Sequence, residues 1–487
     1  MPRFHLPGFA YCLLLFALPA SRAELPPTRP SMPGEPVTVA GGLVALTLSD
    51  AVAVGLANNG DIRSAYLERA AKKTELKMAE DRFSPKLALN SRHVASQTQD
   101  DRFTLTEVSP SATLQGEYGT RFSLAWNNRI AQGGNGGYAR DDGASITVVQ
   151  PLLRGASREV VTAPLRIARL DDQISRLTLK AAVTNTVTQI VISYNEVLRA
   201  QEQQRLAREA LRVACRRMND GFHLIAAGFD FDFDFVEIEA EIAVRELAQE
   251  DAANQLDAGR LRLLRLLGFD LKTQLRAVDP LEVQQIKVNL AQALVAARSQ
   301  QPAFLIQLAA AEQAVIRLEV ARDQQQWDVS LTGGASQMRS RAAGSDTNRS
   351  WENHAGIKID IPFGDSTRRQ AEKRARVDAS NQNNRRTEVR LAMERDVGDA
   401  VRDLGSRWRQ YELAQRAIDL SARKLEAEHE RLRAGRSSDA QMFSRESDVR
   451  AAYLARLDAL IAYRNAQATL DRVQGTTLDS WEISLHD

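Results

Sequence analysis

The sequence predicts a mainly α-helical protein with a smaller β part, built from two copies of one unit. Three observations carry this prediction: an internal repeat, a long and mainly apolar stripe with a seven-residue period, and segments of alternating polarity. Seven apolar positions recur without a gap at a step of 242 (290 − 48 = 242): Leu48, Ala51, Val52, Leu76, Ala79, Leu87 and Leu89 return as Leu290, Ala293, Leu294, Leu318, Ala321, Val329 and Leu331. Farther along, Gly228 and Gly268 recur as Gly435 and Gly475 at a step of 207 (435 − 228 = 207). A duplicated unit of this size sets the architecture.

The first residues have the pattern of a secretory leader. Arg3 and His5 precede the apolar run 9–18, which is followed by small residues suited to cleavage after Ala23. The run is shorter than the roughly 20 residues of a spanning helix. No later stretch is apolar for long enough to span a membrane as a helix, so a membrane-embedded part would consist of β-strands. Removal of the leader would leave Cys215 as the single cysteine, which we expect to be a packing residue on a helix stripe.

Charge and motif content disfavour several functional classes. The chain has 64 basic and 62 acidic residues, whereas nucleic-acid binders usually have a basic excess. Its arginine clusters are interspersed with acids, which indicates solvated helix faces. The sequence contains no His-Glu-x-x-His, no Gly-x-Ser-x-Gly and no phosphate-binding or dinucleotide loop. We therefore expect no catalysis, no cofactor and no metal site.

Each copy has the same order of expected elements: a short helix, a long helix, strands, and two very long helices. Ser49 can cap the first short helix, and Asn58-Asn59-Gly60 can end it. The expected strands are 86–94, 112–127 and 144–150 in the first copy, and 328–338 and 352–361 in the second. We divide the chain into a signal peptide at 1–23, a Pro-rich tether at 24–45, a first repeat at 46–280 with long helices at 157–267, and a second repeat at 281–487 with long helices at 366–474.

The long helices carry the strongest periodic signal. From Val183 to Ile225 an unbroken stripe steps by four and three residues, which is typical of left-handed coiled-coil packing. The segment 157–227 would form one helix of about 100 Å at 1.5 Å per residue. A compact domain needs no helix of that length, so the prediction is a structure that bridges a space.

The strand segments alternate in polarity over about ten residues, as a tilted strand that crosses a bilayer would. Aromatic residues near the strands could form the girdle of a membrane barrel or pack within ordinary sheets: Tyr118, Trp126, Tyr138, Trp327 and Trp351.

The motifs and their double occurrence resemble the TolC-like outer membrane efflux protein family over residues 46–475. The match is carried by LTLSDAVAVGLANN, by Gln150-Pro151-Leu152-Leu153-Arg154-Gly155 with its partner Ile361-Pro362-Phe363-Gly364, and by the turns at Gly228 and Gly435. The resemblance implies a homotrimer whose helices form an α-barrel tunnel in the periplasm. The tunnel would be continuous with a shared 12-stranded outer-membrane β-barrel, to which each chain gives four strands. The implied partners are a periplasmic adaptor protein and an inner-membrane pump or ABC exporter.

The resemblance also implies two kinds of site. Pro151 and Pro362 would mark the strand-to-helix junctions, which suits a residue that donates no ladder hydrogen bond. The turns with Gly228, Phe229, Gly435 and Arg436 would form the periplasmic tip, where an adaptor docks. This chain departs from the family pattern there, since Gln441 stands where the first copy has Asp234, and Leu432 replaces a frequent tyrosine.

The first tip turn alternates Asp and Phe and admits three interpretations. A calcium loop is disfavoured because Phe235 occupies the position where that loop needs glycine. The turn could be a solvated acidic loop with phenylalanines packed inward. Alternatively, threefold symmetry could gather carboxylates into a ring that selects cations at a pore aperture, with Asp230, Asp232, Asp234 and Asp439 as candidates.

The preferred interpretation is a passive outer-membrane channel of a tripartite efflux or type I secretion system. The alternative is a periplasmic coiled-coil adaptor or scaffold without a membrane barrel. The two steps of the repeat differ by 35 (242 − 207 = 35), and this excess lies mostly between Ser96 and Gly143. We therefore expect longer barrel loops or an added hairpin in the first copy.

Overall fold

The computed structural model describes residues 43–97, 102–133, 137–226, 235–342, 346–361 and 363–485. The predicted signal peptide and most of the predicted tether lie outside these ranges. The helices are α1 (Leu48–Asn58), α2 (Gly60–Glu80), the 3₁₀ helix η1 (Asp81–Phe83), α3 (Arg158–Val161), α4 (Ala163–Ala226), α5 (Phe235–Leu267), α6 (Leu290–Gln300), α7 (Pro302–Asp323), α8 (Ser366–Arg433), α9 (Asp439–Gln474) and α10 (Thr477–Ser480). The strands are β1 (Val44–Leu46), β2 (Lys86–Gln97), β3 (Arg102–Gln115), β4 (Arg121–Gly133), β5 (Tyr138–Pro151), β6 (Leu275–Ala277), β7 (Asp328–Ala342) and β8 (Asn348–Asp360).

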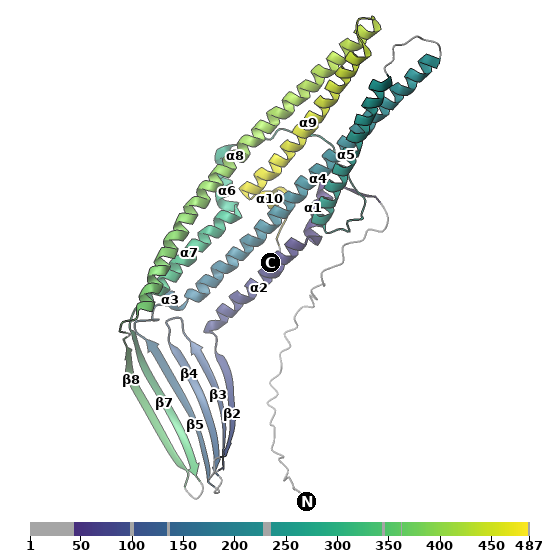
Figure 1. Cartoon of the computed structure of the whole chain (residues 1–487). Helices are drawn as coiled ribbons and strands as arrows, with labels where there is room; N and C mark the ends of the chain where they lie inside the picture. Colours follow the sequence, from purple (N-terminus) through teal and green to yellow (C-terminus); the bar gives the residue numbers. More distant parts are fainter. Residues whose placement is uncertain are drawn as a thin grey trace, which may run out of the picture.

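The molecule is elongated and mainly helical, with the long helices at one end and a sheet at the other (Figure 1). The helix bounds follow the internal repeat. The first residues of α1 and α6 are related by the early step of the repeat (290 − 48 = 242), and so are those of β2 and β7 (328 − 86 = 242). The last residues of α4 and α8 are related by the late step (433 − 226 = 207), and so are those of α5 and α9 (474 − 267 = 207). The two spacings found in the sequence therefore also separate the bounds of equivalent helices and strands in the two copies.

The sheet corrects the expected strand count of four per chain. It contains six antiparallel strands in the order β2-β3-β4-β5-β7-β8. The segment expected as one strand, 112–127, is divided by the turn 116–120, in which Gly119 has a φ of 76°. The strand before this turn also begins earlier than expected, at Arg102 instead of Ala112. The first copy thus contributes β2 to β5, and the second contributes β7 and β8.

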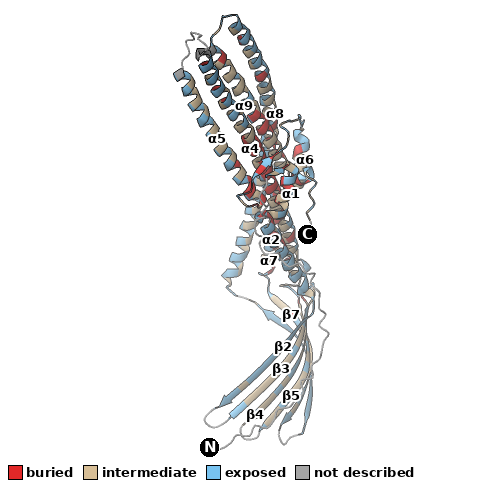
Figure 2. Cartoon of the chain, turned by 90° about the vertical axis from the view of Figure 1, so that its right-hand side faces the viewer, coloured by how far each residue is buried: buried red, intermediate tan, exposed pale blue. Residues whose placement is uncertain are grey.

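The helical core lies where α1, α4 and α5 meet the small parallel sheet of β1 and β6 (Figure 2). Tyr194 on α4 is fully buried; its hydroxyl donates to the carbonyl oxygen of Leu46 (2.9 Å) and accepts from the amide of Val278 (3.2 Å). On α9, the hydroxyl of the buried Tyr463 likewise donates to Gln284 O (3.1 Å). Each tyrosine thereby ties an extended segment to a long helix.

The apolar stripe on α4 is buried in its first half, from Leu179 through Val183, Val187 and Ile190 to Val197. Farther along, the prediction for Cys215 is wrong, because Cys215 is exposed and its neighbour Ala214 is buried instead. Ala214 lies one helical turn after Ala210, which is also buried and faces α5 and α9. In this part of α4 the buried face is therefore the one toward α5 and α9, and not the face that carries Cys215.

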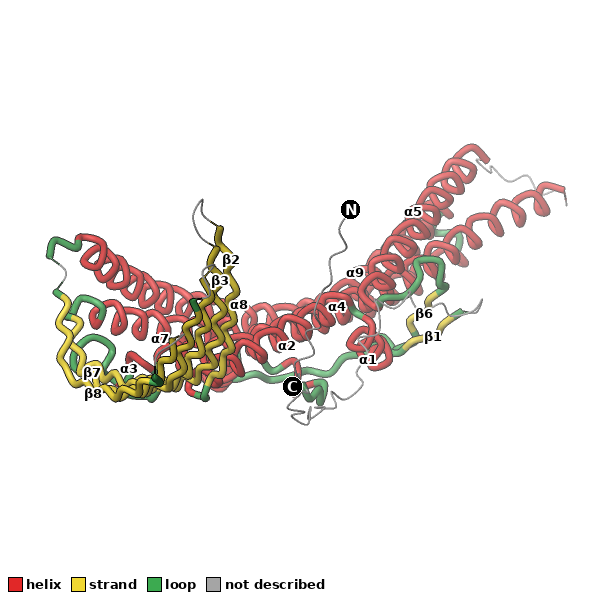
Figure 3. The backbone as a smooth tube through the Cα atoms, turned by 90° about the horizontal axis from the view of Figure 1, so that it is seen from below, coloured by secondary structure: helices red, strands yellow, loops and turns green. Residues whose placement is uncertain are grey.

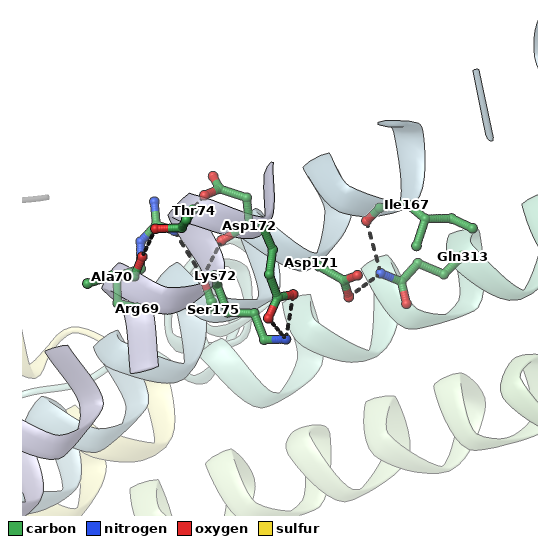
Figure 4. A network of polar contacts seen from close by, with 10 residues as sticks. Arg69, Ala70, Lys72, Thr74, Ile167, Asp171, Asp172, Ser175 and Gln313 are labelled. Atoms are coloured by element: carbon green, nitrogen blue, oxygen red, sulfur yellow. Dashed lines mark hydrogen bonds and ion pairs between the residues drawn. The ribbon is translucent and has the colours of Figure 1, made fainter. Parts of the chain in front are cut away.

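A buried polar layer joins α2, α4 and α7 (Figure 4). Arg69 on α2, which is 4% exposed, donates from Nη1 to Asp172 on α4 at 2.5 Å and to Ser175 Oγ at 3.1 Å. Gln313 on α7 donates to Asp171 at 2.7 Å. These contacts fix the register of three helices within one layer.

Among the helices of the described ranges, none combines the length and apolarity required to cross a membrane.

Candidate functional site

The six-stranded sheet has two chemically different faces. Directly opposed residues of antiparallel strands share a face, so the ladder register assigns every residue to one side. One side, which we call the apolar face, carries apolar side chains on all six strands in the half of the sheet nearer the helices, and charged residues such as Arg140, Asp142 and Arg339 farther out. Its apolar members are Leu87, Leu89, Ala112, Leu114, Phe122, Leu124, Trp126, Ala144, Ile146, Val148, Val329, Leu331, Ala335, Trp351, Ile357 and Ile359.

The opposite side, the polar face, carries charged, hydroxyl and amide side chains. Representative members are Lys86, Asn90, Arg92, Glu107, Ser111, Thr113, Arg121, Ser123, Asn127, Arg129, Asp141, Thr147, Thr332, Glu352 and Lys358. This division into an apolar and a polar wall is the pattern of a barrel that separates lipid from water.

No helix of the described ranges covers the apolar face. The sheet extends beyond the ends of the helices (Figure 1), and apart from Pro151 and Ser330 at the junction with the helices its described residues are half-buried or exposed (Figure 2). Leu87 is 83% exposed, Trp126 58% and Trp351 71%. A soluble monomer rarely exposes so large a contiguous apolar surface. Trp126 and Trp351, two of the predicted girdle residues, lie in one cross-strand row on this face, through Ala144 and Gln337.

The strand-to-helix junction of the first copy is held by backbone and ionic contacts. Pro151 is the last residue of β5 and is paired with Ser330 of β7. The amide of Gly155 donates to Asp323 at 2.9 Å, and Arg154 pairs with Asp328 at 2.5 Å. Burial raises the pKa of Asp323, while the hydrogen bond from Gly155 opposes this rise. Pro362, the predicted partner of Pro151, lies outside the described residues.

Gly119 explains why the β3–β4 turn can sit against this junction. A Cβ at this position would lie 2.1 Å from the carbonyl oxygen of Gly155, and the φ of Gly119 is in the left-handed region. The turn therefore requires glycine, and it brings the start of β4 against the segment that leads into the long helices.

The α8–α9 turn closes one end of the second helical hairpin. Gly435 has a φ of 67°, and Arg436 N donates to Arg431 O (2.8 Å) while Gly435 N donates to Leu432 O (2.9 Å), which is a Schellman cap. Glu428 is buried and accepts from Ser437 Oγ at 2.5 Å. Asp439 is the first residue of α9, and the side chain of Ser438 caps this helix.

A cluster of side chains that the sequence did not predict joins two pairs of long helices, α4 with α5 and α8 with α9. It lies toward the end of the molecule that carries the α8–α9 turn. Arg217 on α4 forms an ion pair with Glu446 on α9 at 2.5 Å. The guanidinium carbons of Arg217 and of Arg245 on α5 lie 5.4 Å and 5.6 Å from the ring centre of Phe443. We call Arg217, Arg245, Phe443 and Glu446 the hairpin clamp.

Arg450 adds an unfavourable charge beside the hairpin clamp. Burial, followed by the repulsion of Arg245, lowers the pKa of Arg450. Its Nη1 atom has no hydrogen-bond partner among the described residues. Arg217 pairs with Glu446, Arg245 pairs with Glu241 of its own helix at 3.3 Å, and both carboxylates partly offset the charge of Arg450. Three arginines thus share two acidic partners, which makes the cluster sensitive to a change of charge.

Other predicted tip residues cannot be placed in this geometry. Gly228, Phe229, Asp230, Asp232 and Asp234 lie outside the described residues. Within the described ranges, no group of three His, Cys, Asp or Glu side chains is arranged to hold a metal ion.

Comparison with known proteins agrees with this geometry. Residues 53–269 match the family model described as outer membrane efflux protein. The Campylobacter jejuni CmeC outer membrane channel superposes with a TM-score of 0.67 at 14% identity, covering 88% of this chain and 86% of that one. The open state of the Neisseria gonorrhoeae MtrE outer membrane channel gives 0.66 at 18% identity, with coverages of 88% and 89%.

The outer membrane protein VceC of Vibrio cholerae gives a TM-score of 0.65 at 13% identity, covering 88% of this chain and 96% of that one. No curated protein sequence matches significantly. Residues 53–269 therefore resemble the outer membrane efflux protein family, and over 88% of its length the chain has the fold of outer membrane channels such as CmeC and MtrE.

Proposed function

We propose that this protein is the passive outer-membrane channel of a tripartite efflux or type I secretion system. Three copies would surround one pathway, with the sheets in the outer membrane and the long helices as a tunnel in the periplasm. A periplasmic adaptor and an inner-membrane pump or ABC exporter would supply cargo and energy. The observation that carries the proposal is the uncovered apolar face, backed by a polar face, at one end of helices about 100 Å long.

The alternative is a periplasmic coiled-coil adaptor or scaffold without a membrane barrel. That function gives no reason for apolar side chains on all six strands. Reconstitution of the purified protein in planar bilayers separates the two. A channel gives stable ion conductance and sediments with outer membranes, whereas recovery from the periplasmic fraction without conductance would exclude the proposed channel.

The aperture of the channel is proposed at the helix-hairpin turns. Asp230, Asp232, Asp234 and Asp439 would form an acidic ring, while Gly228, Phe229, Gly435 and Arg436 would contact the adaptor. Replacement of the three aspartates of the first turn by asparagine should reduce cation selectivity, because carboxylate rings concentrate cations in pores. The reversal potential under a salt gradient measures this change, and an unaltered potential would argue against an acidic aperture.

The hairpin clamp is proposed to hold the tunnel closed near its tip. Arg217→Ala removes the ion pair between α4 and α9, which is worth about 0.2–1 kcal/mol per chain at this exposure. In three concerted copies the closed state should lose about 0.6–3 kcal/mol, which raises a small open fraction by about three- to 150-fold. Single-channel open probability measures the effect.

Arg205→Ala is the matched control for the hairpin clamp. Arg205 pairs with Glu202 of the same helix at 2.7 Å, so its loss leaves the contact between hairpins intact. An equal rise in open probability for both variants would contradict the proposed role of the clamp.

A further inference from the structure

The β3–β4 hairpin is the insertion that distinguishes the two copies. The first residues of β2 and β7 are related by the early step (328 − 86 = 242), whereas the last residues of α4 and α8 are related by the late step (433 − 226 = 207). The difference between the steps (242 − 207 = 35) is close to the length of one hairpin, because β3, its turn and β4 together occupy positions 102–133. Among the described strands, the first copy therefore has one hairpin that the second copy lacks.

This hairpin is part of the wall of the sheet. β3 is paired with β2 from Lys86↔Thr113 to Gln97↔Arg102, and β4 is paired with β5 from Arg121↔Val149 to Gln132↔Tyr138. A loop that merely lay on the surface would not be paired along both sides.

The hairpin also continues both faces of the wall. Leu114, Phe122, Leu124 and Trp126 extend the apolar face, and Thr113, Arg121, Ser123 and Asn127 extend the polar face. A plug within a water-filled lumen or a loop outside the membrane would gain nothing from this division. Since an apolar side faces lipid and a polar side faces water in a membrane barrel, the hairpin has the chemistry of a spanning segment.

The two ends of the sheet are suited to pair with each other in neighbouring copies. β2 begins and β8 ends at the side of the helices, so the two strands run in opposite directions, and all ladders between them are antiparallel. Seen from below, the strands follow an arc from β2 to β8 (Figure 3). Among the described strands, none pairs with the outer edge of either. The hydrocarbon core of a bilayer holds no water that could bond to unpaired backbone groups, so these edges must be covered.

We infer that β8 of one copy pairs with β2 of a second copy, and that three copies close an 18-stranded barrel (3 × 6 = 18) instead of a 12-stranded one. The inference rests on the proposed trimeric channel. Apolar side chains would meet across the new ladder, since Ile357 and Ile359 lie at the same end of the sheet as Leu87 and Leu89.

The larger barrel has a wider lumen. Strands about 4.8 Å apart with a tilt of about 40° give a backbone-to-backbone diameter of about 36 Å for eighteen strands and about 24 Å for twelve. Barrels of 16 to 18 strands leave an aqueous channel. The outer-membrane exit would therefore admit bulkier solutes than a 12-stranded barrel on the same helices.

Disulfide cross-linking in the full-length protein tests which strands meet. Both native cysteines, Cys12 and Cys215, are replaced by alanine, and one cysteine is placed at Gly356 of β8, where a Cβ would meet only Thr332 Oγ1 at 3.7 Å. The second cysteine is placed in turn on the polar face of β2, by Ala88→Cys, Asn90→Cys or Arg92→Cys. The matched controls carry it on the same face of β4, by Ser123→Cys, Ala125→Cys or Asn127→Cys.

At least one variant with its second cysteine on β2 is expected to form a disulfide-linked trimer. The variants with the second cysteine on β4 are expected to form no disulfide between copies. Cross-links to β4, or a covalent dimer as the largest closed product, would overturn the eighteen-stranded arrangement while leaving a membrane channel intact. Failure of the protein to enter the membrane as a trimer would instead contradict the proposed function.

Deletion of residues 102–133 provides a second measurement. The shortened chain should still form a conducting trimer, now with twelve strands. Polyethylene glycols added on the extracellular side should be excluded at about two-thirds of the hydrodynamic diameter that the intact channel admits. An unchanged size cut-off in a conducting deletion variant would show that the hairpin is not part of the barrel wall.

Discussion

Replacing Arg69 by alanine is expected to destabilise the helical part of the protein by about 3 kcal/mol. Arg69 is 4% exposed and donates to Asp172 at 2.5 Å, so its loss leaves a carboxylate in a poorly solvated layer between α2 and α4. Arg176 still reaches Asp172 at 3.2 Å, which keeps the effect at the lower end of the range for a broken buried pair. Urea titration followed by helical circular dichroism measures the change.

Lys72→Ala is the matched control on the same helix. Lys72 pairs with Glu75 at 2.8 Å, but both side chains are about half exposed, and such pairs contribute less than about 1 kcal/mol. A double replacement, Arg69→Met with Asp172→Leu, should recover much of the lost stability, because an apolar pair avoids the cost of burying charge. Equal destabilisation by Arg69→Ala and Lys72→Ala would refute the assigned role of the buried pair.

The duplicated helical architecture could be predicted from the sequence because its signals are local and periodic. Apolar residues at spacings of three and four positions indicate α4 and α8, and the steps of 242 from Leu48 to Leu290 and of 207 from Gly268 to Gly475 align the two copies. Caps are local as well, since the asparagine at 59 and the glycine at 435 act on neighbouring backbone atoms. The prediction that Ser49 caps the first helix is nevertheless wrong, because Thr47 caps α1 through a hydrogen bond to the amide of Asp50.

The strand count could not be predicted in the same way. Leu114 and Phe122 lie on opposite sides of the turn 116–120, yet they are an even number of residues apart, so apolar alternation continues through the turn as though one strand were present. Pro110 lies within β3, and a proline in a strand interior argues against a strand when only the sequence is considered. The ladder from β3 to β4 has no pairs at Ser109 and Pro110, which is how the sheet accommodates this residue.

The hairpin clamp could not be predicted from the sequence either. Arg217 and Glu446 are 229 residues apart, and 26% of the chain is charged, so nothing local singles out this pair. Its members become neighbours only when α4 and α9 pack side by side. The sequence predicts that the basic clusters are solvated helix faces, but Arg217, which belongs to the pair Arg216-Arg217, instead contacts Glu446 and Phe443 of α9.

Leu124→Arg is expected to prevent assembly in the outer membrane. Leu124 is on β4, 54% exposed on the apolar face, between Ala112 and Ile146. An arginine on the lipid side of a barrel costs about 2–4 kcal/mol near the bilayer midplane, and a trimer carries that cost three times. The amount of folded trimer in outer membranes should therefore fall to a small fraction of the wild-type amount.

Ser123→Arg tests whether the effect of Leu124→Arg depends on which face of the sheet receives the arginine, or results from any arginine in β4. Ser123 is the preceding residue on β4 and belongs to the polar face, beside Thr113 and Thr147, so its arginine would enter water. This variant should assemble nearly as well as the wild type and should change mainly the ion selectivity, since charges in a lumen tune selectivity. If Ser123→Arg reduced assembly as strongly as Leu124→Arg, the apolar face could not be the lipid-facing side. If only Ser123→Arg did so, the two faces would have to be exchanged, and the hairpin would present its serines and threonines to lipid.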